Sequence, residues 1–139
     1  MGTPRSFRQA TAATEFAIVL PLLVFFAIAA IDFGRFVYVN LAVSNAARVG
    51  AEYGATHRRT PQNASLWEAQ IVQAAKDELG GIIAADAGEL DVSVEANPDA
   101  SGLTRVDVEV AYPFRTIVAW PAIAGEVSLR HRVTMREFR

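Results

Sequence analysis

The sequence contains no cysteine, only two histidines (His57 and His131), and no excess of basic residues. Without cysteine the chain has neither a disulfide framework nor a thiolate zinc site. The two histidines do not belong to a metal-ligand spacing, so no metal or other cofactor is expected. The formal net charge of -2 provides no basic field of the kind that attracts nucleic-acid phosphates. We therefore expect no nucleic-acid partner.

Motifs of catalysis are also lacking. The sequence has no glycine-rich phosphate loop and no nucleophile elbow. The carboxylates Asp107 and Glu109 alternate with apolar residues, as side chains on the solvated face of a strand do. We expect the chain not to be an enzyme and to have no small-molecule substrate.

Apolar residues are concentrated near the N-terminus. Residues 16–31 carry no charge, and as a helix they would span roughly 24 Å. Adding the small residues from position 11 lengthens the helix to roughly 31 Å, close to the ~30 Å hydrocarbon thickness of a bilayer. This predicts a transmembrane helix over residues 11–35, with Glu15 inside it.

Glu15 needs a partner, because an ionised side chain at membrane depth costs a few kcal/mol. Residues 1–10 form a short basic leader that ends in small residues, where a peptidase could cut. Cleavage between Ala10 and Thr11 would place the new amino group one helical turn before Glu15, on the same face. Amine and carboxylate could then neutralise each other, within one chain or between neighbouring chains.

Two other interpretations of this segment remain open. One is a plain signal anchor with a glutamate at the membrane interface. The other is an ordinary secretory signal peptide, because Ala27-Ile28-Ala29 follows the apolar run as an A-x-A pattern. The signal peptide explains neither Glu15 nor the helical sequence that continues past Asp32.

Four segments of the first third of the chain share a family pattern: ATAATEFA at 10–17, LPLL at 20–23, DFGR at 32–35 and NAARVGA at 45–51. They resemble the TadE-like minor pilins and pseudopilins of tight-adherence (type IVc, Flp) pilus systems. The resemblance implies that Ala10 precedes the bond cut by the prepilin peptidase. It also implies that Glu15, followed by Phe16, is the recognition glutamate at the fifth mature position. Ala10 departs from the glycine more often found there.

The resemblance implies a structural protein that acts in assembly of an adhesive type IV pilus by packing its N-terminal helix. The implied partners are the membrane, other pilin-like subunits, the pilus assembly machinery and the prepilin peptidase. The implied location is the bacterial inner membrane, single-pass, with a cytoplasmic N-terminus and a periplasmic C-terminal domain, and further incorporation into an extracellular pilus. The alternative function is a membrane-tethered periplasmic binding module outside any filament.

Several features of the helix carry structural predictions. Pro21 removes one backbone hydrogen bond and predicts a kink. Asp32 and Arg35, spaced i, i+3, are expected to pair where the span ends. A helix extension follows over residues 36–56, and its small residues would allow close helix packing. These small residues include Ala47, Gly50, Ala51 and Gly54. The small-residue stripe could pack on the protein's own sheet, between subunits, or both.

Residues 57–139 predict a small domain. A capping box, Ser65-Leu66-Trp67-Glu68, is expected to open a second helix, and Gly80-Gly81 to end it. The apolar face of this helix comprises Trp67, Ile71, Ala75 and Leu79.

Three segments of the domain alternate between apolar and polar residues, which predicts half-buried strands near residues 90–94, 106–112 and 127–135. Turn residues at 97–102 predict a hairpin between the first two. Acidic residues of the second strand would face basic residues of the third, Arg130 and Arg132, in antiparallel pairing. The predicted fold is α+β: a long N-terminal transmembrane helix, an additional helix and a small three-stranded antiparallel sheet. Residues 114–124 are apolar without clear periodicity. They either complete the core or form an exposed patch that binds a partner subunit or touches the membrane surface.

Overall fold

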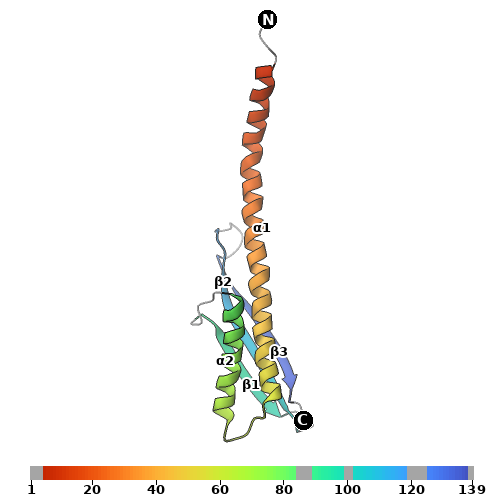
Figure 1. The fold of residues 1–139 in the computed structure, drawn as a ribbon, viewed down its shortest axis with the longest axis vertical. Coiled ribbons are helices and arrows are strands. Elements are labelled where there is room, and N and C mark those ends of the chain that lie inside the picture. The colour runs from red at the N-terminus through yellow and green to blue at the C-terminus, as the bar shows by residue number, and fades with distance from the viewer. Residues whose placement is uncertain (1–4, 84–88, 99–101, 119–124, 138–139) are drawn as a thin grey trace. The chain divides into compact units, whose positions relative to one another are not determined.

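A computed structural model describes residues 5–83, 89–98, 102–118 and 125–137, with side chains from residue 11 onward. The chain consists of two compact units, Met1–Arg35 and Phe36–Arg139. Helix α1 (Arg5–Thr56) contributes to both of them (Figure 1). The leader residues 1–4 lie outside the described residues.

The first unit contains the apolar part of α1. The helix continues through Pro21, as transmembrane helices can when the freed carbonyl group is satisfied locally. The kink at Pro21 stays a prediction. Leucine and alanine in the surrounding turns are strong helix formers and support the uninterrupted helix.

The second unit confirms the predicted α+β fold. It contains the rest of α1, helix α2 (Ala64–Ile82) and strands β1 (Asp91–Pro98), β2 (Thr104–Arg115) and β3 (Glu126–Arg136). The strands form an antiparallel sheet in the order β1-β2-β3. Residues 99–101 of the predicted hairpin turn lie outside the described part. Gly102 has a φ of 77°, which glycine adopts at little cost.

The core lies between one face of the sheet and the two helices. Val106, Val108 and Val110 alternate along β2 and are fully buried, as the period-two pattern predicts. The predicted apolar face of α2 is confirmed, because its four members are buried. From α1, alanines and one valine complete the core: Ala42, Val43, Ala46, Ala47, Ala51 and Ala55.

Glycines in α1 allow this close packing. A Cβ atom on Gly50 would lie 3.3 Å from Val108 Cγ1. At Gly54 it would lie 2.8 Å from both Ile71 Cδ1 and Val106 Cγ1, closer than carbon atoms pack. At Gly54, α1 therefore approaches both α2 and the sheet too closely to leave room for a side chain.

Gly54→Ala is expected to lower the free energy of unfolding by about 1–3 kcal/mol, the usual cost of an added methyl group in a filled core. Val106 is β-branched and cannot rotate away freely. Urea unfolding of the full chain in detergent, followed by circular dichroism, measures the change. Gly80→Ala in α2 is the control, because no atom lies within 4 Å of its Cβ position and alanine favours a helix by up to ~1 kcal/mol. Equal stability of the two variants would contradict the close approach at Gly54.

The predicted boundaries of α2 are wrong by a few residues. The helix begins at Ala64 with Asn63 as its N-cap residue, so Ser65 lies inside the helix instead of capping it. Asn63 is held by a local turn, because its Oδ1 accepts a hydrogen bond from the Thr60 N–H at 2.6 Å. Such turns compete with the capping box for the helix start. At the other end, α2 passes Gly80 and Gly81 and finishes at Ile82.

Of residues 114–118, one belongs to the core and another is exposed, so each interpretation of the apolar segment holds for part of it. Phe114 is buried and packs edge-on against Phe36 of α1, with ring centroids 5.6 Å apart. Ile117 is exposed. The remaining part of this segment, residues 119–124, lies outside the described residues.

Candidate functional site

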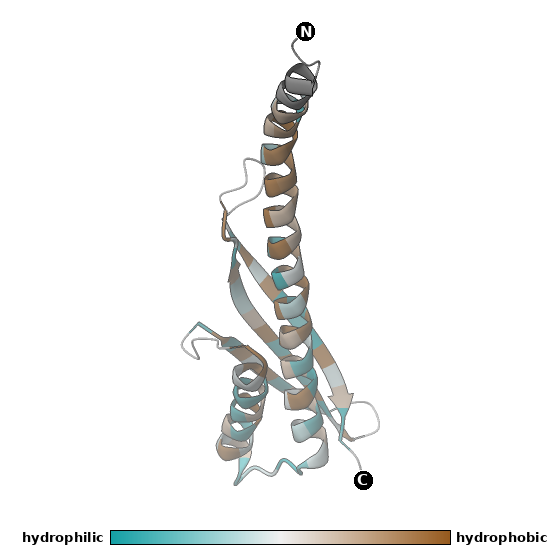
Figure 2. Ribbon diagram, turned by 45° about the horizontal axis from the view of Figure 1, so that its top comes forward, coloured by the Kyte–Doolittle hydropathy of each residue, from teal (hydrophilic) through white to brown (hydrophobic). Residues whose placement is uncertain are grey.

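The candidate site is the surface of α1 in the first unit. Large apolar side chains point outward all around this helix, and Ile18 reaches 73% exposure. Complete burial of such a side chain contributes about 1.5–3 kcal/mol, and in water these side chains would forgo much of that free energy. In Figure 2, the brown colour along this part of α1 marks its hydrophobic residues. Among the described residues, α1 is the one helix with the length and composition to cross a membrane.

Glu15 and Thr11 lie on α1 four residues apart, which places them on the same helical face about one turn from each other. Glu15 and the adjacent Phe16 are both exposed. The backbone of Ala10 is helical, so the predicted scissile bond lies within α1, but its side chain lies outside the described residues. Whether the bond is cut is a prediction that the structure does not test.

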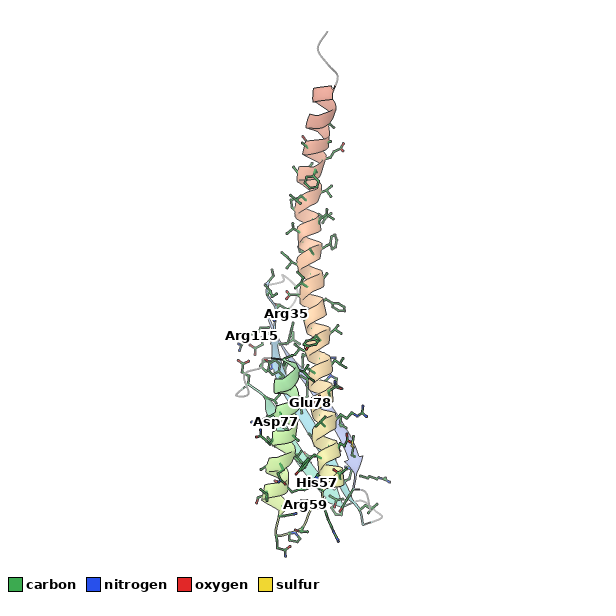
Figure 3. All side chains as sticks on the ribbon, in the orientation of Figure 1. Arg35, His57, Arg59, Asp77, Glu78 and Arg115 are labelled. Atoms are coloured by element: carbon green, nitrogen blue, oxygen red, sulfur yellow. The ribbon has the colours of Figure 1, made fainter. Side chains whose placement is uncertain are left out.

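Asp32 and Arg35 form the predicted ion pair at the end of the apolar segment. Arg35 Nη1 donates to Asp32 Oδ1 at 3.3 Å, and Asp32 is buried. Figure 3 labels Arg35 on α1. A buried carboxylate is stable when an opposite charge is this close. The pair therefore keeps an ionised residue on the helix directly after the apolar turns.

The small residues of α1 occupy one face within the second unit. Ala47, Gly50, Ala51 and Gly54 all lie in the intramolecular core against α2 and the sheet. The opposite face carries Val37 and Leu41, and Leu41 is 59% exposed. One face of this helical segment is thus used inside the subunit, and the other remains open.

Sequence reasoning missed this open face. Phe33, Val37 and Leu41 follow each other at intervals of four residues on α1, which is a helical spacing that could have identified the stripe. Helix packing was predicted for the small residues, which lie on the opposite face. All three members of the stripe are exposed.

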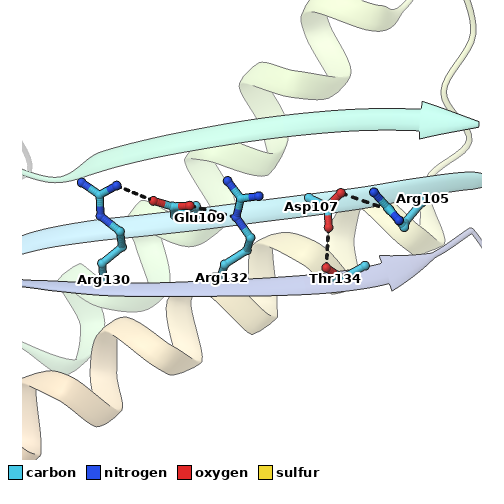
Figure 4. Close-up of polar contacts among 6 residues, drawn as sticks. All are labelled: Arg105, Asp107, Glu109, Arg130, Arg132 and Thr134. Carbon is cyan, nitrogen blue, oxygen red and sulfur yellow. Dashed lines mark hydrogen bonds and ion pairs between the residues drawn. The ribbon is translucent and has the colours of Figure 1, made fainter.

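The sheet presents a charged face away from the helices (Figure 4). Glu109 on β2 pairs with two arginines of β3: Arg132 Nε lies 2.8 Å from Oε2, and Arg130 Nη1 lies 2.9 Å from Oε1. The predicted complementarity of these two strands is confirmed. The hydrogen bond from Arg132 and the two positive charges lower the pKa of Glu109, while partial desolvation opposes this effect. Glu109 in turn raises the pKa of Arg132.

Asp107 corrects the expectation of a fully solvated carboxylate row. It is only 7% exposed, because Arg105 and Thr134 cover it. Arg105 Nε lies 3.2 Å from Asp107 Oδ2, and the Thr134 hydroxyl donates to Oδ1. Each oxygen of the buried carboxylate therefore has a partner, as buried charges require.

The second unit also contains a polar pocket of 560 Å³, lined in part by Arg58, Arg59 and Glu137. Among the described residues, no group of three or more His, Asp or Glu side chains is placed to hold a metal ion. His131 faces α1, where its Nε2 lies 2.9 Å from Asn40 Oδ1. His57 stacks on Tyr53, with ring centroids 3.9 Å apart.

Comparison with known proteins supports the N-terminal part of this description. The model of the family described as TadE-like protein matches residues 10–52, which include Ala10, Glu15, the apolar turns and most of the small-residue face. No curated protein and no solved structure matches the chain. The resemblance predicted from the sequence is confirmed over residues 10–52, which match the TadE-like family, a family associated with the Tad pilus.

Proposed function

We propose that the chain is a minor pilin or pseudopilin that acts in assembly of a tight-adherence pilus by packing its N-terminal helix against other pilin-like helices. The observation that carries the proposal is the coincidence of the TadE-like match with an exposed apolar helix that contains Glu15. In this role the chain is structural and performs no catalysis. The membrane holds the helix before assembly, with the N-terminus cytoplasmic and the C-terminal domain periplasmic.

The open face of α1 supports this proposal. Exposed apolar side chains lie along α1 from Phe16 to Leu41, in a run that the Asp32–Arg35 ion pair interrupts. The run extends over 26 positions, roughly 39 Å of helix, which exceeds the ~30 Å bilayer core. Lipid alone would leave part of this run in water. A neighbouring apolar helix would cover the remainder.

We further propose that the prepilin peptidase removes residues 1–10 and leaves Thr11 as the new N-terminus. Its ammonium group would lie one turn from the Glu15 carboxylate. In the apolar environment of packed helices, this pairing lowers the cost of the charge on Glu15. Pairing between staggered neighbours would additionally set the register of the subunits.

The second candidate is a membrane-tethered binding module, which the polar pocket beside Arg58 and Arg59 favours. In that case α1 serves as an anchor only, and its sequence could be exchanged for that of another anchor without loss of function. The two functions therefore differ in how they respond to a change of anchor.

Replacing residues 1–31 with an unrelated single-pass anchor of equal length tests the proposal. We expect pili to be lost, because the replacement retains membrane attachment but lacks Glu15 and the apolar face that neighbouring helices contact. Electron microscopy of sheared pili gives the readout, and membrane fractionation shows that the chimera is inserted. Normal piliation with the foreign anchor would contradict the proposal and favour the binding module.

A further inference from the structure

The two edges of the sheet carry opposite charges on the face away from the helices. β1 and β3 are the edge strands of the sheet in the described part of the chain. Edge strands present backbone N–H and C=O groups that can pair with another chain. On this face β1 carries Asp91 and Glu95, while the arginines of β3 are Arg130, Arg132 and Arg136. All five side chains are exposed.

The ion pairs within one chain do not cancel the charge difference between the β1 and β3 edges. Glu109 is shared between Arg130 and Arg132, so one carboxylate meets two guanidinium groups. The β3 edge therefore keeps a positive surplus. The β1 edge has no basic residue between positions 91 and 98.

From these edges we infer that a second copy of this chain adds to the sheet, with β1 of one copy pairing with β3 of the next. Both strands run antiparallel to β2, so they run parallel to each other. Two copies in the same orientation would therefore form a parallel pair at the junction. Parallel pairs are slightly less stable than antiparallel ones, which makes the side-chain match important.

One register satisfies the charges and the apolar face together. It places Asp91 of one copy opposite Arg132 of the next and, since both pairs are spaced by four residues, Glu95 opposite Arg136. Cross-strand pairs of opposite charge stabilise a sheet. Val94 falls opposite Met135 on the inner side, where both are partly buried against the core. The apolar layer of one copy thus continues into the next.

The same charges disfavour pairing of like edges. Two β1 edges would place acids side by side, and two β3 edges would place arginines side by side, which destabilises a sheet. The junction is therefore heterologous, and a heterologous junction repeats into a ring or a helical filament. It also lies entirely within the Phe36–Arg139 unit. A negative result at the junction would therefore leave the proposed role of the N-terminal helix intact. Equally, loss of that role would leave the junction intact.

The absence of cysteine makes the junction directly testable by disulfide trapping. In the inferred register, Ser93 of one copy lies opposite Thr134 of the next. Within one chain these positions are separated by β2, at least about 9.6 Å, too far for a disulfide bond. Membranes containing both full-length Ser93→Cys and Thr134→Cys chains, distinguished by different tags, are oxidised with copper phenanthroline.

The inference predicts a cross-linked dimer containing both tags, and little dimer when either variant is present alone. Adding Glu95→Arg to the Ser93→Cys chain should lower the yield about five-fold, because like charges then meet. Adding Arg136→Glu to the other chain should restore it. The cross-linking is repeated with Glu95→Cys and Arg136→Cys, which test the same register at a second point. This second pair leaves the hydrogen bond from Thr134 to Asp107 in place. Absence of the mixed dimer at both points, or equal dimer from single variants, would overturn the inference.

Discussion

Glu15→Ala is expected to abolish pilus assembly while leaving membrane insertion intact. Removing an ionised side chain from the apolar segment lowers the cost of insertion, so the variant should enter the membrane at least as well. What it loses is the carboxylate one turn from Thr11, on the exposed surface of α1. We expect at least a ten-fold loss of pili by electron microscopy, in a strain that depends on this chain for piliation.

Two further variants make the Glu15 result specific. Glu15→Gln keeps the size of the side chain but cannot carry the charge, so it should behave like Glu15→Ala. Asp77→Ala removes an exposed acid from α2, outside the anchor, and should leave piliation unchanged. Normal pili in the Glu15→Ala strain would remove the glutamate from the assembly role.

Trp67→Ala is expected to cost about 3–5 kcal/mol of stability, the largest effect of a single truncation in the second unit. Trp67 is only 2% exposed, and its ring lies against Gly54, where a Cβ atom would have no room. Its Nε1–H donates to the His57 carbonyl at 2.7 Å, which ties the loop after α1 to α2. The truncation removes the ring and this hydrogen bond together. Urea unfolding in detergent, followed by circular dichroism, measures the loss.

Leu66→Ala is the matched control, because Leu66 is the adjacent residue of α2 and is 61% exposed. Its truncation should change the free energy of unfolding by no more than about 0.5 kcal/mol. Trp67→Phe keeps an aromatic ring without the N–H donor and should fall between the two. Similar losses for Leu66→Ala and Trp67→Ala would contradict the assigned core position of Trp67.

Patterns with a single physical cause could be predicted from the sequence. The alternation of Val106, Val108 and Val110 identifies a strand and its buried face together, because side chains of a strand alternate between faces. The charges of Glu109 and Arg132 identified the neighbouring strand. The i, i+3 spacing of Asp32 and Arg35 identified their ion pair, since that spacing is a property of the helix alone.

Features that depend on what lies opposite a residue could not be predicted in this way. The stripe containing Gly50 and Gly54 shows that something approaches α1 closely, but not whether it is the same chain or another one. The contact between Asn40 and His131 joins residues 91 positions apart, and no local pattern indicates it. At α2, the turn between Thr60 and Asn63 competed with an equally good capping box.

The candidate site likewise contains one feature that the sequence could predict and one that it could not. Glu15 could be identified because a carboxylate stands out in an apolar segment, and it lies within the residues that the TadE-like model matches. The exposed stripe through Val37 and Leu41 could not, because apolar residues at helical spacing are as typical of a buried face. Exposure in the folded unit distinguishes the two.

The proposals place two assembly surfaces on the chain, one on α1 and one on the sheet. The first is the apolar helix with Glu15, and the second is the pair of oppositely charged sheet edges. The helix lies largely in the family-matched residues 10–52, whereas the sheet lies outside them. Variants in one surface should therefore leave the other testable.

The N-terminal sequence of the mature protein tests the central claim most directly, because it reports whether α1 begins where the Thr11–Glu15 pairing requires. Chains extracted from the membrane of a piliated strain are analysed by Edman degradation or mass spectrometry of the terminal peptide. The account predicts a start at Thr11, and a start at Met1 in a strain without the prepilin peptidase. A start at Met1 in the piliated strain, or at Ala30 after cleavage as a signal peptide, would contradict it.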